Sequence, residues 1–310
     1  MHQKAIKPAP AGHRKKCEPR LSELVDMNNP ASVLEEIKTI VRSIDAGYGE
    51  IEKLERAFQD ILRLFNGHYP GYRKCNTPYH DLNHTTDTVL AMARLIHGAR
   101  LSGFLLKSRD ITLGLIAALM HDVGYIQRDS ESEGTGARFS QVHIPRGIAF
   151  MRTYMRRKGY STYDYRKCRA ALLCTDLSLP VHTILFETRT NELMGKMLAT
   201  ADLVGQTADR RYLEKLKFLY QEFREAGMRD YGSELELLRD SLVFNSHIKS
   251  RLADDLGGVD RILTGHFKAR WGIDRNLYRD GMNKNVTYLK YFLNEDPEHY
   301  SRFLKRMEGS

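Results

Sequence analysis

The stretch Leu113-Gly-Leu-Ile-Ala-Ala-Leu-Met-His121-Asp122-Val-Gly124-Tyr125 places an imidazole and a carboxylate side by side at the end of an apolar run. Leu, Ile, Ala and Met in such a run favour a helix buried in a core. Burying His121 or Asp122 there without a partner would be strongly unfavourable. The doublet therefore predicts a partner for both side chains, and a divalent metal ion is the obvious one.

A second polar cluster, Tyr79-His80-Asp81-Leu-Asn83-His84-Thr-Thr-Asp87, lies upstream. On a helix, His80 and His84 would lie one turn apart on the same face. Both could then be metal ligands, or one a ligand and the other a catalytic acid facing the same cavity. Asp87 would share that face and could hold an imidazole ring in position. An HxxxH pair alone is more often exposed or structural, and the His121-Asp122 doublet is what favours the metal site.

Two imidazoles and one aspartate leave a divalent cation short of protein ligands, so a further carboxylate is expected. Asp202, in Met197-Leu-Ala-Thr-Ala-Asp202-Leu, is an acid embedded in an otherwise apolar helix. Asp176, in Ala171-Leu-Leu-Cys-Thr-Asp176-Leu, is a second candidate of the same kind. For either residue alone, a capping or salt-bridged aspartate is an equally good interpretation.

Helix signals dominate the rest of the chain, with apolar residues recurring at three- and four-residue steps. Asn29-Pro30 is a start signal for a helix over residues 31–46. Strand-like alternation is scarce, and the glycine motifs GxGxxG and GxxxxGK[ST] are absent. The sequence therefore predicts an all-α fold. Further helices are expected near residues 51–65, 82–98, 110–122, 145–157, 164–177, 192–206 and 209–226.

Two segments interrupt the helical pattern. Residues 127–140 form a polar, glycine-bearing loop after the doublet, which is either the mobile rim of an active site or a simple surface loop. Residues 228–285 are less regular, and glycines there are expected to separate short helices.

The composition is ordinary for a soluble globular protein, with 42% hydrophobic and 28% charged residues among 310. The four cysteines show no CxxC spacing, which is typical of reduced thiols in the cytoplasm. No apolar run approaches the roughly 18 residues that span a bilayer, and the residues after Met1 lack the apolar stretch of a signal peptide. We therefore expect a cytoplasmic protein without a membrane partner.

The formal net charge is +9, and residues 1–20 carry six Lys or Arg against the single acid Glu18. We expect a basic, disordered tail over residues 1–30, a helical catalytic domain over 31–226, and a helical C-terminal extension over 227–310 that packs on the core. A second basic stretch, from Arg152 to Arg169, could attract an anionic substrate or nucleic acid, although a solvated helix face is the more frequent case. No nucleic-acid-binding motif accompanies either basic stretch, and the oligomeric state is left open.

The order His84, His121-Asp122, Asp202 resembles the H…HD…D signature of the HD superfamily of metal-dependent phosphohydrolases. Four segments also resemble, in order, segments of the catalytic domain of the class I cyclic nucleotide phosphodiesterases, and the similarity covers about residues 60–226. These segments are residues 79–87, 115–123, 173–178 and 201–203, the last followed by Gln221-Glu222-Phe223.

The resemblance implies a compact multi-helix bundle of the HD/phosphodiesterase type. It implies that His84, His121, Asp122 and Asp202 are metal ligands, that Asp122 bridges to a second metal, and that His80 is the general acid that protonates the leaving oxygen. One or two divalent ions are then the cofactors, and mixed His/Asp ligation suits Zn²⁺, Mn²⁺ or Fe²⁺ in one site and Mg²⁺ in the other.

The chain departs from the phosphodiesterase pattern at Tyr125, where those enzymes have a second histidine. Their later histidine-rich segment and purine-clamping glutamine also have no match, which argues against cyclic AMP or cyclic GMP as the substrate. Val142-His143-Ile-Pro-Arg-Gly147 is similar to the HxxxG segment of bacterial HD domains, including the cyclic-di-GMP hydrolases, in which the histidine binds the second metal. A histidine at the entry of a helix is the alternative interpretation of His143.

The sequence thus predicts a metal-dependent phosphohydrolase that cleaves a small, nucleotide-like phosphodiester or phosphate ester by metal-activated water. A non-catalytic HD-like module that binds a ligand or a protein is the alternative. Tyr125 favours the module, whereas an intact His80 favours the enzyme. A nucleic-acid-associated hydrolase that uses the basic tail is a third possibility, and it has no motif to support it.

Overall fold

The structure, a computed structural model, describes residues 19–228 and 231–304. These residues form a compact multi-helix bundle without a strand, and an isolated bridge joins Tyr72 to Arg128. The all-α prediction is confirmed. The α-helices are α1 (Leu21–Leu24), α2 (Pro30–Ile44), α3 (Ile51–Phe65), α4 (Leu82–Leu101), α5 (Ser108–Met120), α6 (His143–Arg157), α7 (Thr162–Leu173), α8 (Arg189–Ala208), α9 (Tyr212–Glu225), α10 (Glu234–Ala253), α11 (Leu263–Trp271) and α12 (Leu277–Glu295). Short 3₁₀ turns are η1 (Val123–Tyr125), η2 (Gly136–Phe139), η3 (Val181–Thr183), η4 (Val259–Ile262) and η5 (Pro297–Phe303).

Helix α4 is the central element of the bundle. It packs against α2, α5, α8 and α11, and its residues from His84 to Ala99, except Asp87, are buried. Small and apolar side chains on every face suit a helix enclosed on all sides. Because α4, α5 and α8 pack against one another, polar side chains near their ends can converge in one buried place.

The start of α4 corrects one expectation. Asp81 is its N-cap, and the Asp81 carboxylate accepts a hydrogen bond of 2.8 Å from the backbone N–H of His84. His80 therefore precedes the helix and does not share a helical face with His84. The two rings are nevertheless close, with centroids 5.9 Å apart, because the chain bends at the cap.

Two further helices differ from expectation. Residues 234–253 form one continuous helix, α10, where glycine-separated short helices were expected. Helix α7 ends at Leu173 and not near residue 177, because the N–H groups of Cys174, Thr175 and Asp176 bond to carbonyls three residues back and tighten the last turn.

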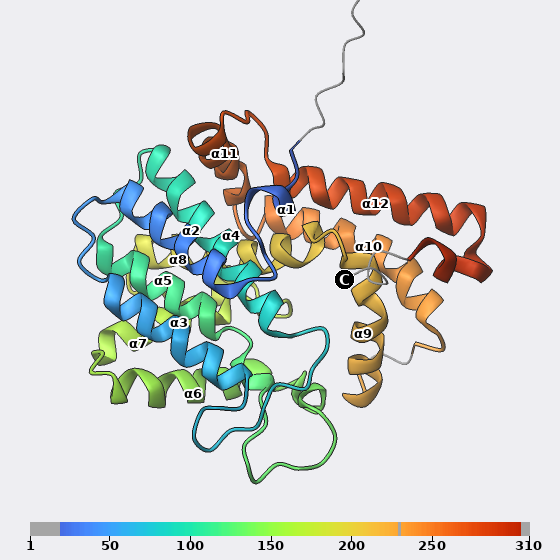
Figure 1. Ribbon diagram of the computed structural model, residues 1–310, viewed down its shortest axis with the longest axis horizontal. Coiled ribbons are helices and arrows are strands. Elements are labelled where there is room, and N and C mark those ends of the chain that lie inside the picture. The colour runs from blue at the N-terminus through green and yellow to red at the C-terminus, as the bar shows by residue number, and fades with distance from the viewer. Residues whose placement is uncertain (1–18, 229–230, 305–310) are drawn as a thin grey trace, which may run out of the picture.

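The C-terminal helices share their packing with the rest of the molecule. Phe267 of α11 and Tyr278 of α12 belong to the main core cluster, together with side chains of α2 to α8. A second cluster joins Tyr212 and Leu213 of α9 to α10 and α12. Figure 1 shows α10 and α12 running side by side beyond the bundle, with α9 beside them.

The expected tail over residues 1–30 is too long at its C-terminal end. Leu21, Leu24 and Met27 pack against the main core, and Val25 is buried within it. These four apolar side chains explain why the segment from residue 21 onward is packed against the bundle. Residues 1–18, which hold most of the expected tail, lie outside the described residues.

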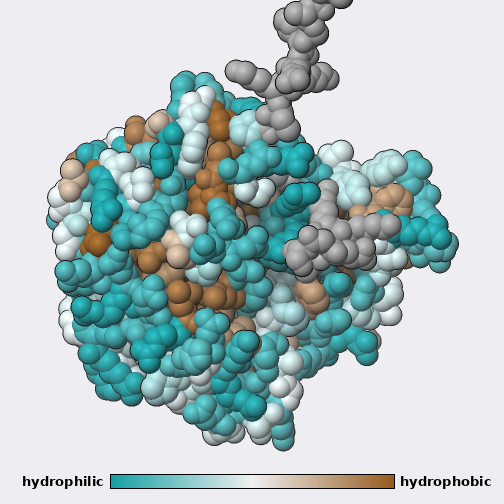
Figure 2. Space-filling view, in the orientation of Figure 1, coloured by the Kyte–Doolittle hydropathy of each residue, from teal (hydrophilic) through white to brown (hydrophobic). Residues whose placement is uncertain are grey.

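Hydrophilic residues cover most of the face seen in Figure 2, and hydrophobic ones show as strips and small groups among them. No helix in the described part of the chain is both long enough and apolar enough to cross a bilayer. Cys75, Cys168 and Cys174 are free thiols, the last two buried.

Candidate metal centre

The side chains of His84, His121, Asp122 and Asp202 meet where α4 begins, α5 ends and α8 passes. His84 lies in the first turn of α4, His121 is the C-cap of α5, and Asp122 leads into η1. Asp202 lies in α8. His84, His121 and Asp122 are almost fully buried, and they form a group that could hold a metal ion.

The donor atoms of these four side chains lie close together. His84 Nε2 lies 3.2 Å from Asp122 Oδ2, 3.2 Å from Asp202 Oδ1 and 3.1 Å from His121 Nε2. His121 Nε2 lies 3.1 Å from Asp122 Oδ2 and 3.7 Å from Asp202 Oδ1. Metal–ligand bonds of about 2.0–2.2 Å in a tetrahedral site separate the ligand atoms by about 3.3–3.6 Å. The spacing of His84, His121 and Asp122 therefore fits one cation, and Asp202 Oδ1 lies beside the two imidazoles.

Two observations support the fit to a cation. Asp122 Oδ2 is buried and accepts no hydrogen bond, although two imidazole nitrogens are within 3.2 Å. His121 Nδ1 lies 2.8 Å from the carbonyl oxygen of Ala118, and a carbonyl only accepts, so Nδ1 carries the proton. His121 Nε2 then offers a lone pair toward the centre of the cluster, as a metal-binding imidazole does.

The charges of this cluster are strongly coupled. Burial by itself lowers the pKa of His84, but the adjacent carboxylates of Asp122 and Asp202 outweigh it and raise that pKa to about 10. The pKa of His121 is also raised, against the effect of burial, chiefly by Asp122. Burial raises the pKa of Asp122, yet His121 and His84 hold it well below its ordinary value. These directions favour a proton bound between the imidazoles and the carboxylates in the absence of a cation.

His80 lies beside this cluster and is paired with Glu222, a residue to which the sequence analysis assigned no role. Its Nδ1 lies 2.6 Å from Glu222 Oε2 of α9. The other oxygen of Glu222 accepts a 2.7 Å bond from the backbone N–H of Tyr79. The Glu222 side chain is almost fully buried, and it fixes His80 from a position 142 residues away in the chain.

A second chain of contacts holds Asp202. Gln206, one turn further along α8, donates from Nε2 to Asp202 Oδ1 at 3.2 Å. The hydroxyl of Tyr79 in turn donates to Gln206 Oε1 at 2.9 Å. The segment before α4 therefore positions side chains on both α8 and α9.

His143 reaches the other oxygen of Asp122. It is the first residue of α6, its Nδ1 donates to the Ser140 carbonyl at 2.6 Å, and its Nε2 lies 4.0 Å from Asp122 Oδ1. Gly124 makes this approach possible, because a Cβ there would lie 1.8 Å from the His143 carbonyl oxygen. Tyr125 lies between His143 and His80, stacked on both rings.

Asp87 and Asp176 lie apart from this group of donor atoms. Asp87 Oδ1 is buried and accepts no hydrogen bond, and burial together with Asp209 raises the Asp87 pKa to about 8. No bond from Asp87 to an imidazole is present in the described residues, so its orienting role stays a prediction. Asp176 lies in the turn after α7, where its Oδ1 accepts bonds from the Ser178 N–H at 2.8 Å and hydroxyl at 2.6 Å. Asp176 therefore makes a local turn contact, and its role as a metal ligand stays a prediction.

Other segments singled out in the sequence are engaged elsewhere. In the basic stretch, Lys158 pairs with Asp60, Arg166 with Glu187, and Lys167 with Asp110. The loop over residues 127–140 is tied to α9 through two bonds from Thr135 to Glu225. The loop is therefore fastened at the edge of the helix that supplies Glu222.

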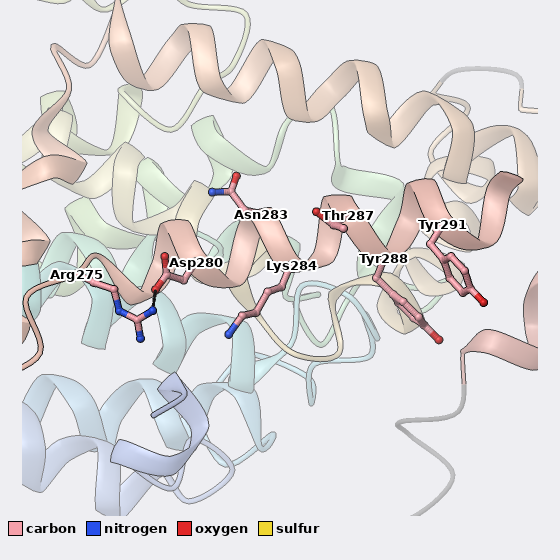
Figure 3. Close-up of a pocket in the computed structure, with 7 residues that line it drawn as sticks. All are labelled: Arg275, Asp280, Asn283, Lys284, Thr287, Tyr288 and Tyr291. Carbon is pink, nitrogen blue, oxygen red and sulfur yellow. Dashed lines mark ion pairs between the residues drawn. The ribbon is translucent and has the colours of Figure 1, made fainter. Parts of the chain in front are cut away.

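A hollow of about 570 Å³ lies along α12, away from the donor cluster. Figure 3 shows Arg275 and Lys284 extending to the same side of the helix, with Arg275 paired to Asp280. No predicted site residue lines this hollow. Its lining residues are Arg275, Asp280, Asn283, Lys284, Thr287, Tyr288 and Tyr291.

Comparison with known proteins gives a family and no activity. The model of the family described as Npun_R2479-like matches residues 29–240, more than half of the chain, and the chain therefore belongs to this family. No curated protein matches it. The matched range contains every side chain of the donor cluster, together with His80 and Glu222.

Proposed function

We propose that this member of the Npun_R2479-like family is a metal-dependent phosphohydrolase of the HD type. The observation that carries the proposal is a pair of facing imidazoles, His84 and His121, each with the carboxylates of Asp122 and Asp202 3.1–3.7 Å from its Nε2. A third imidazole, that of His80, stands beside them on a buried carboxylate. Such groups can hold a divalent ion and supply a proton, which are the two functions that promote phosphoester hydrolysis.

His84, His121, Asp122 and Asp202 would hold the ion. Mixed nitrogen and oxygen donors suit Zn²⁺, Mn²⁺ or Fe²⁺. A second ion, for which Mg²⁺ is suited, would use Asp122 Oδ1 and His143 Nε2, which face each other at 4.0 Å. The proposed cofactor is therefore one or two divalent ions. A second ion binds only if His143 acts as a ligand.

The bound ion supplies a water molecule of lowered pKa and neutralises charge on the phosphoryl oxygens. The surrounding protein residues orient the ligands. Gln206 holds Asp202 in its ligating orientation, and the Ala118 carbonyl keeps the lone pair of His121 directed at the ion. Each of these orienting contacts preserves a donor in the state that binds a cation.

His80 would donate the proton that the leaving oxygen needs. Its Nδ1–H is held by Glu222 at 2.6 Å, which leaves Nε2 directed away from that carboxylate. An imidazole changes charge near neutral pH, which suits proton transfer. To act as the acid, the ring would carry a second proton on Nε2 while Glu222 keeps the Nδ1–H, and it would give the Nε2 proton to the leaving oxygen. The ring lies close to His84, with centroids 5.9 Å apart, which is near where a phosphoester bound to the ion would be cleaved.

A small, nucleotide-like phosphate anion is the proposed substrate. A buried cationic centre attracts the phosphate, and the HD resemblance favours a phosphodiester or a phosphate ester. The free buried thiols of Cys168 and Cys174 support a reducing, cytoplasmic location.

The test combines elemental analysis with turnover. Purified wild-type protein is expected to contain about one or two divalent ions per chain and to hydrolyse bis(4-nitrophenyl) phosphate or a member of a nucleotide panel. Asp122→Asn, which removes a charged donor at nearly constant volume, is expected to lose both properties. Asp176→Asn is the matched control and should keep both. Full activity in Asp122→Asn would defeat the proposal, and bound metal without turnover on the whole panel would favour a non-catalytic binding module.

A further inference from the structure

Tyr125 lies in the middle of a stack of three rings. Its ring centroid is 4.3 Å from that of His80, with an interplanar angle of 12°, and 4.5 Å from that of His143, with an angle of 19°. Two rings this close and this parallel to one phenol cannot occupy the same face of it without overlapping. The two imidazoles therefore lie on opposite faces of Tyr125.

The phenol ring is itself rigidly held. Tyr125 is 4% exposed and lies in η1, three residues after Asp122. The backbone of η2 packs directly on the Tyr125 backbone, since a Cβ on Gly136 would lie 2.1 Å from the Tyr125 carbonyl oxygen, and this fixes the point from which the ring projects. A fixed ring between two imidazoles can set the planes of both.

Each imidazole has one hydrogen bond that is insufficient on its own. His80 Nδ1 is held by Glu222, and His143 Nδ1 is held by the Ser140 carbonyl. A single bond at Nδ1 fixes where that nitrogen lies, but it leaves the ring able to swing about the bond. Contact of the ring face with Tyr125 removes that freedom, so that the bond and the stack together fix the direction of Nε2.

We propose that Tyr125 is a positioning residue that holds the proton donor His80 and the candidate ligand His143 on its two faces. The inference rests on the proposed function for the role of His80. The ring keeps His80 Nε2 directed at the leaving oxygen and keeps it from turning toward the cation. On the other face it keeps His143 Nε2 directed at Asp122 Oδ1. The flat ring of Tyr125 fixes the orientation of both imidazoles, and its hydroxyl is not required for this.

Three substitutions separate the ring from the hydroxyl and from simple volume. Tyr125→Phe keeps the flat face and is expected to retain kcat for bis(4-nitrophenyl) phosphate within about threefold. Tyr125→Leu fills the space without a flat face. Its kcat is expected to fall about 10- to 100-fold, because small misplacement of a catalytic group has effects of this size. KM and the ion bound by His84, His121, Asp122 and Asp202 are expected to stay unchanged.

Tyr154→Leu is the matched control, because Tyr154 is a buried tyrosine of α6 whose ring stacks on Phe150 and not on a histidine. It should retain kcat, and circular dichroism reports folding for the whole set. Equal kcat in Tyr125→Leu and wild type would overturn the inference. A loss in Tyr125→Phe as large as in Tyr125→Leu would also overturn it, since the hydroxyl would then be the active part. A rise in KM with kcat unchanged would do the same.

A measurement on the zinc-loaded protein separates this inference from the proposed function. The ring current of Tyr125 should shield the imidazole protons of His80 and His143 in the NMR spectrum of ¹³C-histidine-labelled wild type. Tyr125→Phe should preserve the shielding and Tyr125→Leu should remove it from both residues. A wild type that hydrolyses no ester defeats the proposed function, while shielding in that same protein still supports the stack-held geometry. Unshielded imidazoles in the wild type overturn the inference whatever the activity.

Discussion

Two histidine pairs of opposite character lie near the two ends of α4. Near its start, His84 Nε2 lies 3.1 Å from His121 Nε2. Near its end, His97 Nδ1 lies 2.8 Å from His266 Nδ1. All four imidazoles are buried. Judged by residue type and spacing alone, the two pairs are alike.

The two pairs differ in the charge of the groups around them, which is negative at the first pair and positive at the second. The first pair faces the carboxylates of Asp122 and Asp202, which raise the pKa of His84 to about 10. The second pair has no acid within ion-pairing distance in the described residues. Burial, followed by the nearby cation of Arg94, lowers the pKa of His266 to about 2. Two buried imidazoles therefore make a cation site only where carboxylates join them.

The largest expected effect comes from replacing one imidazole in each pair. His84→Gln removes a donor atom and should weaken metal binding by more than about 100-fold, a larger loss than removal of an orienting partner causes. His266→Gln should leave metal content and activity unchanged, because no carboxylate draws a cation to that end. Competition with a fluorescent chelator measures both affinities. Equal metal affinity in the two variants would break the comparison.

The next effect concerns proton transfer at the start of α4. His80→Ala should lower kcat by about 100-fold, the lower end of what general acid–base catalysis contributes. The bound metal should be unchanged, since His80 is bonded to Glu222 and not to the donor cluster. His182→Ala, at an exposed histidine in η3, is the control for removing an imidazole. Steady-state kinetics with elemental analysis decides the outcome, and a loss of metal in His80→Ala would show that its role was misassigned.

The metal affinity of the cluster around His84 should depend on pH. Because the pKa of His84 is raised to about 10, the metal-free cluster holds a proton at pH 7 that a cation must displace. In the metal-free protein this raised pKa stabilises the fold fully below the ordinary pKa of 6.5, and the contribution is lost as pH rises through about 10. Metal affinity should therefore rise about tenfold per pH unit for each proton released across this range.

Isothermal titration calorimetry in buffers of different ionisation enthalpy counts the protons released on binding. The measured heat should depend on the buffer at pH 7. A heat that is independent of the buffer would mean that no proton leaves, contrary to the assigned protonation of His84.

The smallest expected effect is a change in the free energy of unfolding on replacing Arg94, the cation near the His97–His266 end of α4. The Arg94 side chain is fully buried, and its Nε and Nη2 donate no hydrogen bond. Its stabilising contacts are one bond to the Tyr278 hydroxyl and the faces of three aromatic rings. Unsatisfied buried donors cost about 1–3 kcal/mol each, and an apolar side chain often replaces a buried ion without loss.

Arg94→Met should therefore increase the free energy of unfolding by about 1 kcal/mol. Arg270→Met, at a partly exposed arginine paired with Glu36, should change it by less than about 1 kcal/mol. Urea denaturation measures both variants. A decrease of more than about 2 kcal/mol in Arg94→Met would show that the guanidinium is better satisfied than its contacts indicate.

The sequence was sufficient for the donor cluster because its anomaly is local. A histidine and a carboxylate in an apolar run need a partner wherever the run is buried, and the same logic applies to Asp202. Glu222 was not assigned a role, because its pairing with His80 is set by tertiary packing across 142 residues. Asp81 did carry a signal, since aspartate is a preferred N-cap, and it would have placed His80 outside α4.

Helix α10 shows a different limit of prediction from sequence. Its buried side includes the polar residues Ser241 and Asn245 beside Leu237, Leu238 and Ile248. Asn245 satisfies its amide within the helix by donating to the Ser241 carbonyl at 2.7 Å. Polar residues on the buried face interrupt the apolar period, and the segment then resembles irregular chain.

Under the proposed function, the contact between Gly124 and the first turn of α6 bears on how many ions the site would hold. A methyl group at this position would collide with the backbone of His143, so a change of one carbon atom would push α6 away from Asp122 without changing any side chain of the donor cluster. Under the proposed function, Gly124→Ala would then leave the ion at His84, His121, Asp122 and Asp202 without a second ion beside His143.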